Sequence, residues 1–293
     1  MKYYEVKFTL SPLSADACDL LAALAGDAGF ETFEETTEGI CGYVQQQLFE
    51  RELLDALLQD FPLTDVTISY TIDEAEDRDW NEQWEQEGFE PIIVNGTQGG
   101  REHLVCGMVI HDGRHLPTGN FDLQVEIDAH LAFGTGTHET TQMVCATLLD
   151  LFNSPASDIY RVLDCGCGTG ILGITAMKLG AQECIGYDID EWSVDNTRHN
   201  AVINQVEVTP LHGDASILNK VEGRFDLVMA NINRNILLQD MPMFREKMAQ
   251  GARLVLSGFY TDDIALLTEK AATLGLSLTA RRECNEWACI VLQ

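Results

Sequence analysis

A glycine-rich stretch, RVLDCGCGTGILG (residues 161–173), constrains the fold more than any other part of the sequence. An apolar strand-like run precedes the glycines and an apolar helix-like run follows them, a pattern typical of a tight turn from a strand into a helix. Backbone at such a turn can approach a ligand closely, because glycine has no side chain. The stretch predicts an α/β domain with a ligand site beyond the carboxyl end of this strand.

The sequence after this stretch alternates between strand and helix patterns, which predicts a doubly wound sheet. Strands are expected at 160–165, 183–190, 206–211, 225–232 and 252–259, with helices at 171–180, through 192–201, past 236 and at 261–275. The last two strands, 276–284 and 286–293, are separated by Asn285 alone. So short a link requires a hairpin, and therefore an antiparallel strand on an otherwise parallel sheet.

The first 72 residues follow a different pattern, strand, helix, strand, strand, helix, strand, which predicts a ferredoxin-like α+β module. Residues 73–91 then carry nine acidic residues, Trp80, Trp84 and Phe89. This segment is either a linker helix whose aromatic side chains dock on a domain or an acidic, aromatic surface for a basic substrate. We expect three regions: the ferredoxin-like domain at 1–72, a linker with connecting strands at 73–115, and the main domain at 116–293.

Charge restricts the class of partner. Asp and Glu number 47 against 18 Lys and Arg, giving a formal net charge of -29. Such a surface repels phosphate backbones, so direct nucleic-acid binding is disfavoured, and a basic protein partner is favoured unless the charge only maintains solubility. The amino terminus resembles a strand rather than a signal peptide, and no apolar run suits a membrane span. The nine cysteines lack metal-ligand spacing. We expect a cytoplasmic protein with reduced cysteines and no metal.

The glycine stretch fits two cofactor patterns, and their registers differ. The dinucleotide pattern would begin at Gly168, two residues too late after the strand for pyrophosphate to reach the first helical turn. The other pattern, D-x-G-x-G-x-G, begins at Asp164 and Gly166 and is typical of S-adenosylmethionine enzymes. Their cofactor has no phosphate, so it needs a tight backbone turn and a nearby acidic group rather than a phosphate site. Asp188, near the end of the next strand, can accept hydrogen bonds from ribose hydroxyls in either pattern, so it does not distinguish them. Register and the final hairpin therefore favour S-adenosylmethionine.

Two further motifs, LAFGTGTHETT (131–141) and ANI (230–232), complete a pattern with VLDCGCGTGILGI and GYDID. Together they closely resemble the bacterial ribosomal protein L11 methyltransferase (PrmA) family over essentially the whole chain. The resemblance implies a Rossmann-like S-adenosylmethionine methyltransferase domain behind the ferredoxin-like module. It also implies methylation of the α-amine and lysine ε-amines of that basic ribosomal protein, which the front module recognises. Family positions for the cofactor map onto Thr141, Gly166, Asp188 and Asn231.

The sequence departs from the family pattern at three places. Ala129 and His130 replace an expected Pro-Gly, Glu139 replaces a proline, and Asn233 with Arg234 replaces small apolar residues. These departures affect the shape of the acceptor channel rather than the cofactor assignment.

Each candidate site residue has a functional and a structural interpretation. Asn231 can orient the incoming amine or cap the next helix, and Thr141 can bind the cofactor carboxylate or start a helix. His138 can act as a base, although a lone histidine in such a loop is more often structural. Asp214 can bind the adenine amino group or cap a turn. These patterns do not identify a general base; we expect the amine to lose its proton to solvent before transfer, and positioning to supply most of the catalysis.

Three other functions remain open at this point. A dinucleotide oxidoreductase would use the Gly168 register, and a noncatalytic sensor would bind S-adenosylmethionine without transferring its methyl group. A methyltransferase for another basic protein would share every cofactor residue. The target residues, the number of methyl groups and the oligomeric state are not encoded in these patterns, although we favour a monomer.

Overall fold

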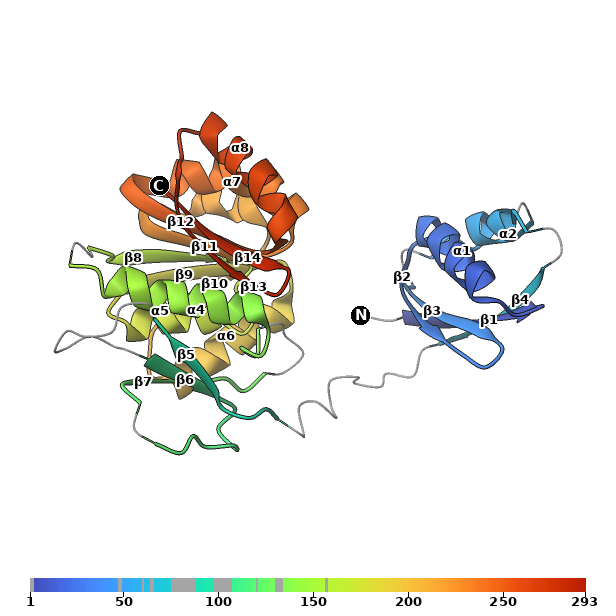
Figure 1. Cartoon of the computed structure of the whole chain (residues 1–293), viewed down its shortest axis with the longest axis horizontal. Coiled ribbons are helices and arrows are strands. Elements are labelled where there is room, and N and C mark those ends of the chain that lie inside the picture. Colours follow the sequence, from blue (N-terminus) through green and yellow to red (C-terminus); the bar gives the residue numbers. More distant parts are fainter. Residues whose placement is uncertain are drawn as a thin grey trace. The chain divides into compact units, whose positions relative to one another are not determined.

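The computed structural model describes residues 3–46, 49–59, 61–63, 66–74, 88–96, 107–119, 121–129, 134–155 and 158–293. The chain forms two compact units, Met1–Glu82 and Gln83–Gln293 (Figure 1). Each unit has its own buried core. Most of the acidic, aromatic segment at 73–91, namely residues 75–87, lies outside the described residues.

The first unit has the predicted order of strands and helices: β1 (Tyr3–Ser11), α1 (Ala15–Ala25), β2 (Phe30–Glu35), β3 (Gly39–Gln45), α2 (Arg51–Gln59) and β4 (Thr67–Glu74), with a short 3-10 turn, η1 (Gly26–Ala28), after α1. Its sheet has the order β2-β3-β1-β4, and all neighbours are antiparallel. Alternation along β1 buries Val6, Phe8 and Leu10 in a core shared with Leu21 and Leu54. Both helices cover the same face (Figure 1), so the ferredoxin-like prediction is confirmed.

The second unit begins with a small sheet, β5 (Ile92–Asn95), β6 (Gly107–His111) and β7 (Leu123–Glu126). β5 pairs antiparallel with β6, and β6 pairs in parallel with β7. Because β6 and β7 lie on either side of residues 115–116, this sheet spans the point at which the sequence analysis divided linker from main domain. Glycine and proline in the connecting loop led to that division, whereas strand pairing across the loop joins the two parts.

The large sheet has seven strands: β8 (Arg161–Cys165), β9 (Glu183–Asp188), β10 (Thr209–His212), β11 (Phe225–Asn231), β12 (Met248–Tyr260), β13 (Leu278–Cys284) and β14 (Trp287–Leu292). Their order is β10-β9-β8-β11-β12-β14-β13. The first five are parallel, and β14 is antiparallel to both of its neighbours. The predicted hairpin is confirmed, and Asn285 makes its turn with a φ of 52°.

Helices cover both faces of this sheet (Figure 1). One buried core includes side chains of α4 (Glu139–Phe152), α5 (Ile171–Lys178) and α6 (Glu191–Ile203), and also those of the small sheet. The core on the other face is formed with η2 (Ala215–Lys220), α7 (Arg234–Lys247) and α8 (Ile264–Thr273). This is the doubly wound α/β architecture predicted from the alternation. Within the described residues, no helix is long and apolar enough to cross a membrane.

The strand order reverses between β8 and β11, and open α/β sheets bind ligands outside the carboxyl ends of strands at such a point. Cys165, the last residue of β8, pairs with Ala230 of β11. Gly166 and Asn231 therefore leave the sheet side by side. The glycine loop and the ANI motif, 65 residues apart in the sequence, meet here.

Candidate functional site

The glycine loop turns directly after β8 and lies against the end of β11. Backbone N–H groups of Gly166 and Cys167 donate to the Tyr187 carbonyl oxygen, at N–O distances of 2.9 and 3.0 Å. Gly166 has a φ of 69°, and a Cβ at this position would lie 2.5 Å from Ile232 Cγ2. Both the left-handed backbone and this close approach require glycine. The first glycine after the strand is thus Gly166, as the S-adenosylmethionine register predicts.

Asp164 places a buried carboxyl group behind the loop. Its side chain is 1% exposed, and its Oδ2 accepts a hydrogen bond from the Gly173 N–H at 2.9 Å. Its Oδ1 is buried and has no hydrogen-bond partner. Burial raises the pKa of Asp164 to about 8, the Gly173 N–H opposes this shift, and the Asp188 charge adds to it. An acceptor of this kind suits a cationic group, which would favour the ionised carboxylate.

Gly173 lies inside α5, and a Cβ there would be 2.8 Å from Cys184 Sγ. It therefore serves close packing of the helix on the sheet, as expected, and does not belong to a phosphate-binding turn. The described cysteines are all free thiols, and those at 41, 145, 165, 167, 184 and 289 are buried, in agreement with their prediction as small fillers.

Asp188 ends β9 and faces the glycine loop. Its Oδ2 accepts from the Gly168 N–H at 2.9 Å, and its Oδ1 accepts from the Asp190 N–H at 3.1 Å. Each carboxylate oxygen has a second lone pair, so two hydroxyl groups can still be accepted. The side chain is only partly buried. Asp188 thus shapes the loop and retains acceptor capacity toward a ligand.

Asn231 and Thr141 come from different elements and contact each other. Asn231 Nδ2 donates to Thr141 Oγ1 at 3.3 Å, while Asn231 Oδ1 is buried without a partner. Helix α7 is capped by Asn233, whose side chain accepts from the Ile236 N–H at 3.1 Å. The capping interpretation of Asn231 is therefore wrong: the cap lies two residues later, and Asn231 keeps a free acceptor.

The structural interpretations fit His138 and Asp214. His138 caps α4, because its Nδ1 accepts from the Thr140 N–H at 3.2 Å. Thr141 lies in the first turn of that helix but does not cap it. Asp214 caps η2 by accepting from the Ser216 N–H at 2.9 Å, and hydrogen bonds from the Ser216 side chain and backbone lower the Asp214 pKa. A contact of Asp214 with adenine stays a prediction.

The departures from the family pattern make local bonds. Glu139 opens α4, and its Oε1 accepts from Asn285 Nδ2 at 2.8 Å. Arg234 forms an ion pair with Asp263 at 2.8 Å. Residues 130–133, including His130, lie outside the described residues. Further along the same motif, the Gly134 carbonyl oxygen accepts from Thr169 Oγ1 at 2.6 Å, which ties this motif to the glycine loop.

Sequence analysis did not identify a set of aromatic side chains at the same edge of the sheet. The Tyr260 ring stacks on Trp287, and the His138 ring meets Trp287 edge to face. These residues are far apart in the sequence, and no motif connects them. Tyr260 and Trp287 meet because β12 pairs antiparallel with β14, which places them opposite each other, and no sequence motif predicts this register.

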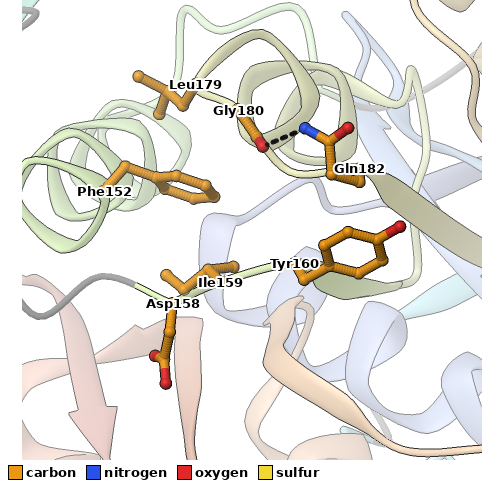
Figure 2. A pocket seen from close by; sticks show the side chains of 7 residues that line it. All are labelled: Phe152, Asp158, Ile159, Tyr160, Leu179, Gly180 and Gln182. Atoms are coloured by element: carbon orange, nitrogen blue, oxygen red, sulfur yellow. Dashed lines mark hydrogen bonds between the residues drawn. The ribbon is translucent and has the colours of Figure 1, made fainter.

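A hollow of about 440 Å³ lies elsewhere, at the amino ends of β8 and β9 (Figure 2). It is lined by Phe152, Asp158, Ile159, Tyr160, Leu179, Gly180 and Gln182. Most of these residues precede the strands, whereas the glycine loop and Asn231 follow them, so the hollow is at the opposite edge of the sheet. Among the described residues, no cluster of three or more His, Cys, Asp or Glu side chains is arranged to hold a metal ion.

Comparisons with known proteins agree with the motif analysis. The family model of Ribosomal protein L11 methyltransferase (PrmA) matches residues 25–293. The chain is 43% identical over 291 residues to the ribosomal protein L11 methyltransferase of Phocaeicola vulgatus, which covers 99% of this chain and 98% of that protein. It is 40% identical over 298 residues to that of Porphyromonas gingivalis, covering 99% and 97%.

A solved structure of similar fold is that of the ribosomal protein L11 methylase from Lactobacillus delbrueckii subsp. bulgaricus. It has a TM-score of 0.56 and 25% sequence identity, and the alignment covers 64% of this chain and 94% of that chain.

Proposed function

Because this chain belongs to the ribosomal protein L11 methyltransferase (PrmA) family, we propose that it transfers methyl groups from S-adenosylmethionine to amines of ribosomal protein L11. The acceptors are the amino-terminal α-amine and lysine ε-amines. As a member of this family, the chain is an S-adenosylmethionine-dependent protein methyltransferase.

One observation carries the proposal: two buried oxygen atoms without partners flank the glycine loop at the strand-order reversal. These are Asp164 Oδ1 and Asn231 Oδ1. An unsatisfied buried acceptor is costly, and native proteins rarely retain one unless a ligand or water completes it. The two atoms and the Gly166 turn fit a ligand that carries an ammonium group, such as the methionine part of S-adenosylmethionine.

In this proposal, different residues around the loop bind different parts of the cofactor. Asp164 Oδ1 accepts from the cofactor's ammonium group, and the Thr141 hydroxyl, whose oxygen already accepts from Asn231, donates its proton to the cofactor's carboxylate. Asp188 accepts from the ribose hydroxyls. Gly166 lets the backbone curve around the methionine part. The bound cofactor supplies a methyl carbon on a positively charged sulfur.

Asn231 orients the acceptor amine. Its amide is fixed by the bond to Thr141, so its free Oδ1 points to a defined position. A neutral amine that donates one N–H to this oxygen directs its lone pair toward the methyl carbon. When bound, S-adenosylmethionine would supply the methyl group from a sulfonium sulfur, which would leave with the electron pair of its carbon–sulfur bond, and the amine nitrogen would then lose its extra proton to water.

The protonation state of the amine sets the pH dependence. Lysine has a reference pKa of about 10.4 and an α-amine one of about 7.7–8.0, so both are partly or mostly protonated at neutral pH. With no base assigned, we expect the rate to rise with pH between about 6 and 9. A flat profile would contradict proton loss to solvent.

We further propose that the enzyme acts as a cytoplasmic monomer on protein rather than nucleic acid, in keeping with its net charge of -29.

Incubation with methyl-labelled S-adenosylmethionine and ribosomal proteins that lack methylation, L11 among them, followed by mass spectrometry, tests the proposal. We expect label on the amines of this protein and its loss with Asn231→Ala. Label on another basic protein only would keep the chemistry and discard the substrate. Cofactor binding without transfer to any ribosomal protein would instead indicate a sensor.

A further inference from the structure

Three aromatic side chains form a partly exposed surface at the carboxyl edge of the sheet, which we call the aromatic rim: Tyr260, Trp287 and His138. The Tyr260 and Trp287 rings are stacked, with centroids 4.3 Å apart and an interplanar angle of 27°. The His138 ring meets Trp287 at 4.8 Å and 74°. Tyr260 is 50% exposed. A stack of this kind on the surface has room for a further group against its faces or edges.

The aromatic rim is connected to Asn231 from two sides. Ser257 of β12 pairs with Asn231, and Tyr260 ends the same strand three residues later. Between them, Gly258 has a φ of 90°, and a Cβ there would lie 2.5 Å from the Ile232 carbonyl oxygen. The end of β12 therefore passes directly beside the residue that follows Asn231.

The second connection runs through α4. His138 caps this helix, and Thr141 in its first turn accepts the hydrogen bond from Asn231. The aromatic rim thus belongs to the same edge of the sheet as the free Asn231 oxygen.

Acidic residues adjoin the residues of the aromatic rim in the sequence. Glu139 follows His138, and Asp262 and Glu286 are exposed neighbours of Tyr260 and Trp287. The Thr261 N–H donates to the Glu286 carbonyl oxygen at 2.8 Å, so these two segments are in contact. The cation closest in sequence to Asn231, Arg234, is paired with Asp263. The local charge is therefore negative, which favours a cationic occupant.

We propose that the aromatic rim receives the cationic, amine-bearing side chain of the acceptor protein and directs it toward Asn231, an inference that rests on the proposed function. An ammonium group is attracted to the face of Trp or Tyr, and the methylene stem of lysine packs on the same rings. A neutral ring attracts the ammonium group less strongly than a contacting carboxylate does. The ring therefore raises the pKa of the amine less than a carboxylate would, so the proton loss that transfer requires is opposed less.

Steady-state methylation of unmethylated ribosomal protein L11 by the full chain tests this role, with cofactor affinity measured separately by calorimetry. Tyr260→Leu removes an exposed ring at little cost to the core, and Tyr260→Phe restores the ring. Trp287→Leu is a second variant. Tyr160→Leu is the matched control, since Tyr160 is 61% exposed at the opposite edge of the same sheet.

We expect Tyr260→Leu and Trp287→Leu to raise the KM for the acceptor roughly 3- to 10-fold while the cofactor Kd stays within about 2-fold. Tyr260→Phe and Tyr160→Leu should match the wild type. An unchanged acceptor KM for Tyr260→Leu, or an equal loss of cofactor affinity, would overturn the inference.

Calorimetric titration of the S-adenosylhomocysteine-loaded protein with L11 separates this inference from the proposed function. If the wild type binds L11 without methylating it, the proposed function fails. The inference then stands only if Tyr260→Leu weakens that binding. If the wild type neither binds nor methylates L11, both fail.

Discussion

At the amino edge of the seven-stranded sheet, the N–H groups of Tyr160 and Arg161 both donate to Asp226 Oδ2, at 3.1 and 2.9 Å. The Arg161 guanidinium pairs with Glu183 at 2.8 Å and lies over the Phe225 ring, although its Nε has no partner. At the carboxyl edge, Asp164 Oδ1 and Asn231 Oδ1 are buried and accept nothing, and Tyr187 Oη is also buried without a partner. The amino edge has the hollow of about 440 Å³, and the carboxyl edge has buried oxygens with unmet hydrogen-bonding capacity.

This difference shows why volume alone does not locate the site in this fold. The hollow offers few directional contacts, because Phe152, Ile159 and Leu179 are apolar and Gln182 Nε2 already donates to the Gly180 carbonyl oxygen (Figure 2). Buried acceptors without partners gain a full hydrogen bond when a donor arrives, because their desolvation cost has already been incurred in folding. We therefore assign cofactor binding to the carboxyl edge, and the predictions below compare the two edges.

The largest effect is expected from adding a methyl group to the glycine loop. Gly166→Ala places a Cβ 2.5 Å from Ile232 Cγ2 at a φ of 69°, so the loop or the Ile232 side chain must shift and the backbone is strained. We expect cofactor affinity to fall at least about 100-fold and stability to fall by about 1–3 kcal/mol. Calorimetry and thermal unfolding measure the two effects.

Gly180→Ala is the matched control at the amino edge. Gly180 also has a positive φ, 118°, but no atom lies within 4 Å of an added Cβ. It should lose stability through backbone strain and keep its cofactor affinity. Equal loss of affinity in both variants would remove the distinction between the edges.

Removal of the free amide oxygen of Asn231 should slow turnover. We expect Asn231→Ala to lower kcat about 100-fold, because the acceptor amine loses its orienting contact. Asn233→Ala removes only the cap of α7 and should cost about 1 kcal/mol of stability with kcat nearly unchanged. Steady-state rates with L11 as acceptor compare them. If Asn233→Ala slows turnover as much as Asn231→Ala, the orienting role is wrong.

A pH-dependent effect is expected from Asp164, whose pKa burial raises to about 8. Without ligand, the folded state binds more protons than the unfolded state between the usual aspartate pKa and about 8. Stability therefore falls as pH rises through this interval. A cationic ligand favours the carboxylate, so cofactor binding should release a proton and strengthen from pH 6 to 7.5, by at most about tenfold per unit.

Calorimetry in buffers of different ionisation enthalpy measures this proton release directly. Asp164→Asn should bind more weakly and release no proton at Asp164, while the cofactor's own amine titration remains in both proteins. The same proton release in the wild type and the variant would show that Asp164 does not contact the ligand.

The smallest effect is expected at the amino edge. Gln182→Ala removes the hydrogen bond from Gln182 Nε2 to the Gly180 carbonyl oxygen, 2.8 Å long and exposed (Figure 2). Stability should change by no more than about 0.5 kcal/mol, and cofactor affinity should not change. A several-fold change in affinity, measured by calorimetry, would mean that the hollow contributes to the site.

Much of the fold was predictable because it depends on local pattern. Alternation in β1, the strand-to-helix turn at Gly166 and the one-residue link at Asn285 each allow few structures, and all three were predicted correctly. The small sheet was harder to assign. Its strands pair across a loop rich in glycine and proline, and the parallel pairing of β6 with β7 is not visible in a linear pattern.

The candidate site was predictable where a motif directly follows a strand, and less predictable where segments distant in the sequence come together. Gly166 and Asp188 could be placed by register, whereas the Asn231 contact with Thr141 spans 90 residues. Asn231 and Asn233 are equally suitable by residue type to cap the next helix. Only the end of β11 at Asn231 separates their roles.

A crystal structure of the chain with S-adenosylhomocysteine tests the central claim most directly. The account predicts the ligand over the Gly166 turn, with its ammonium group on Asp164 Oδ1 and its ribose hydroxyls on Asp188. Density for the ligand in the hollow lined by Phe152 and Tyr160, with Asp164 Oδ1 and Asn231 Oδ1 still unpaired, would contradict it.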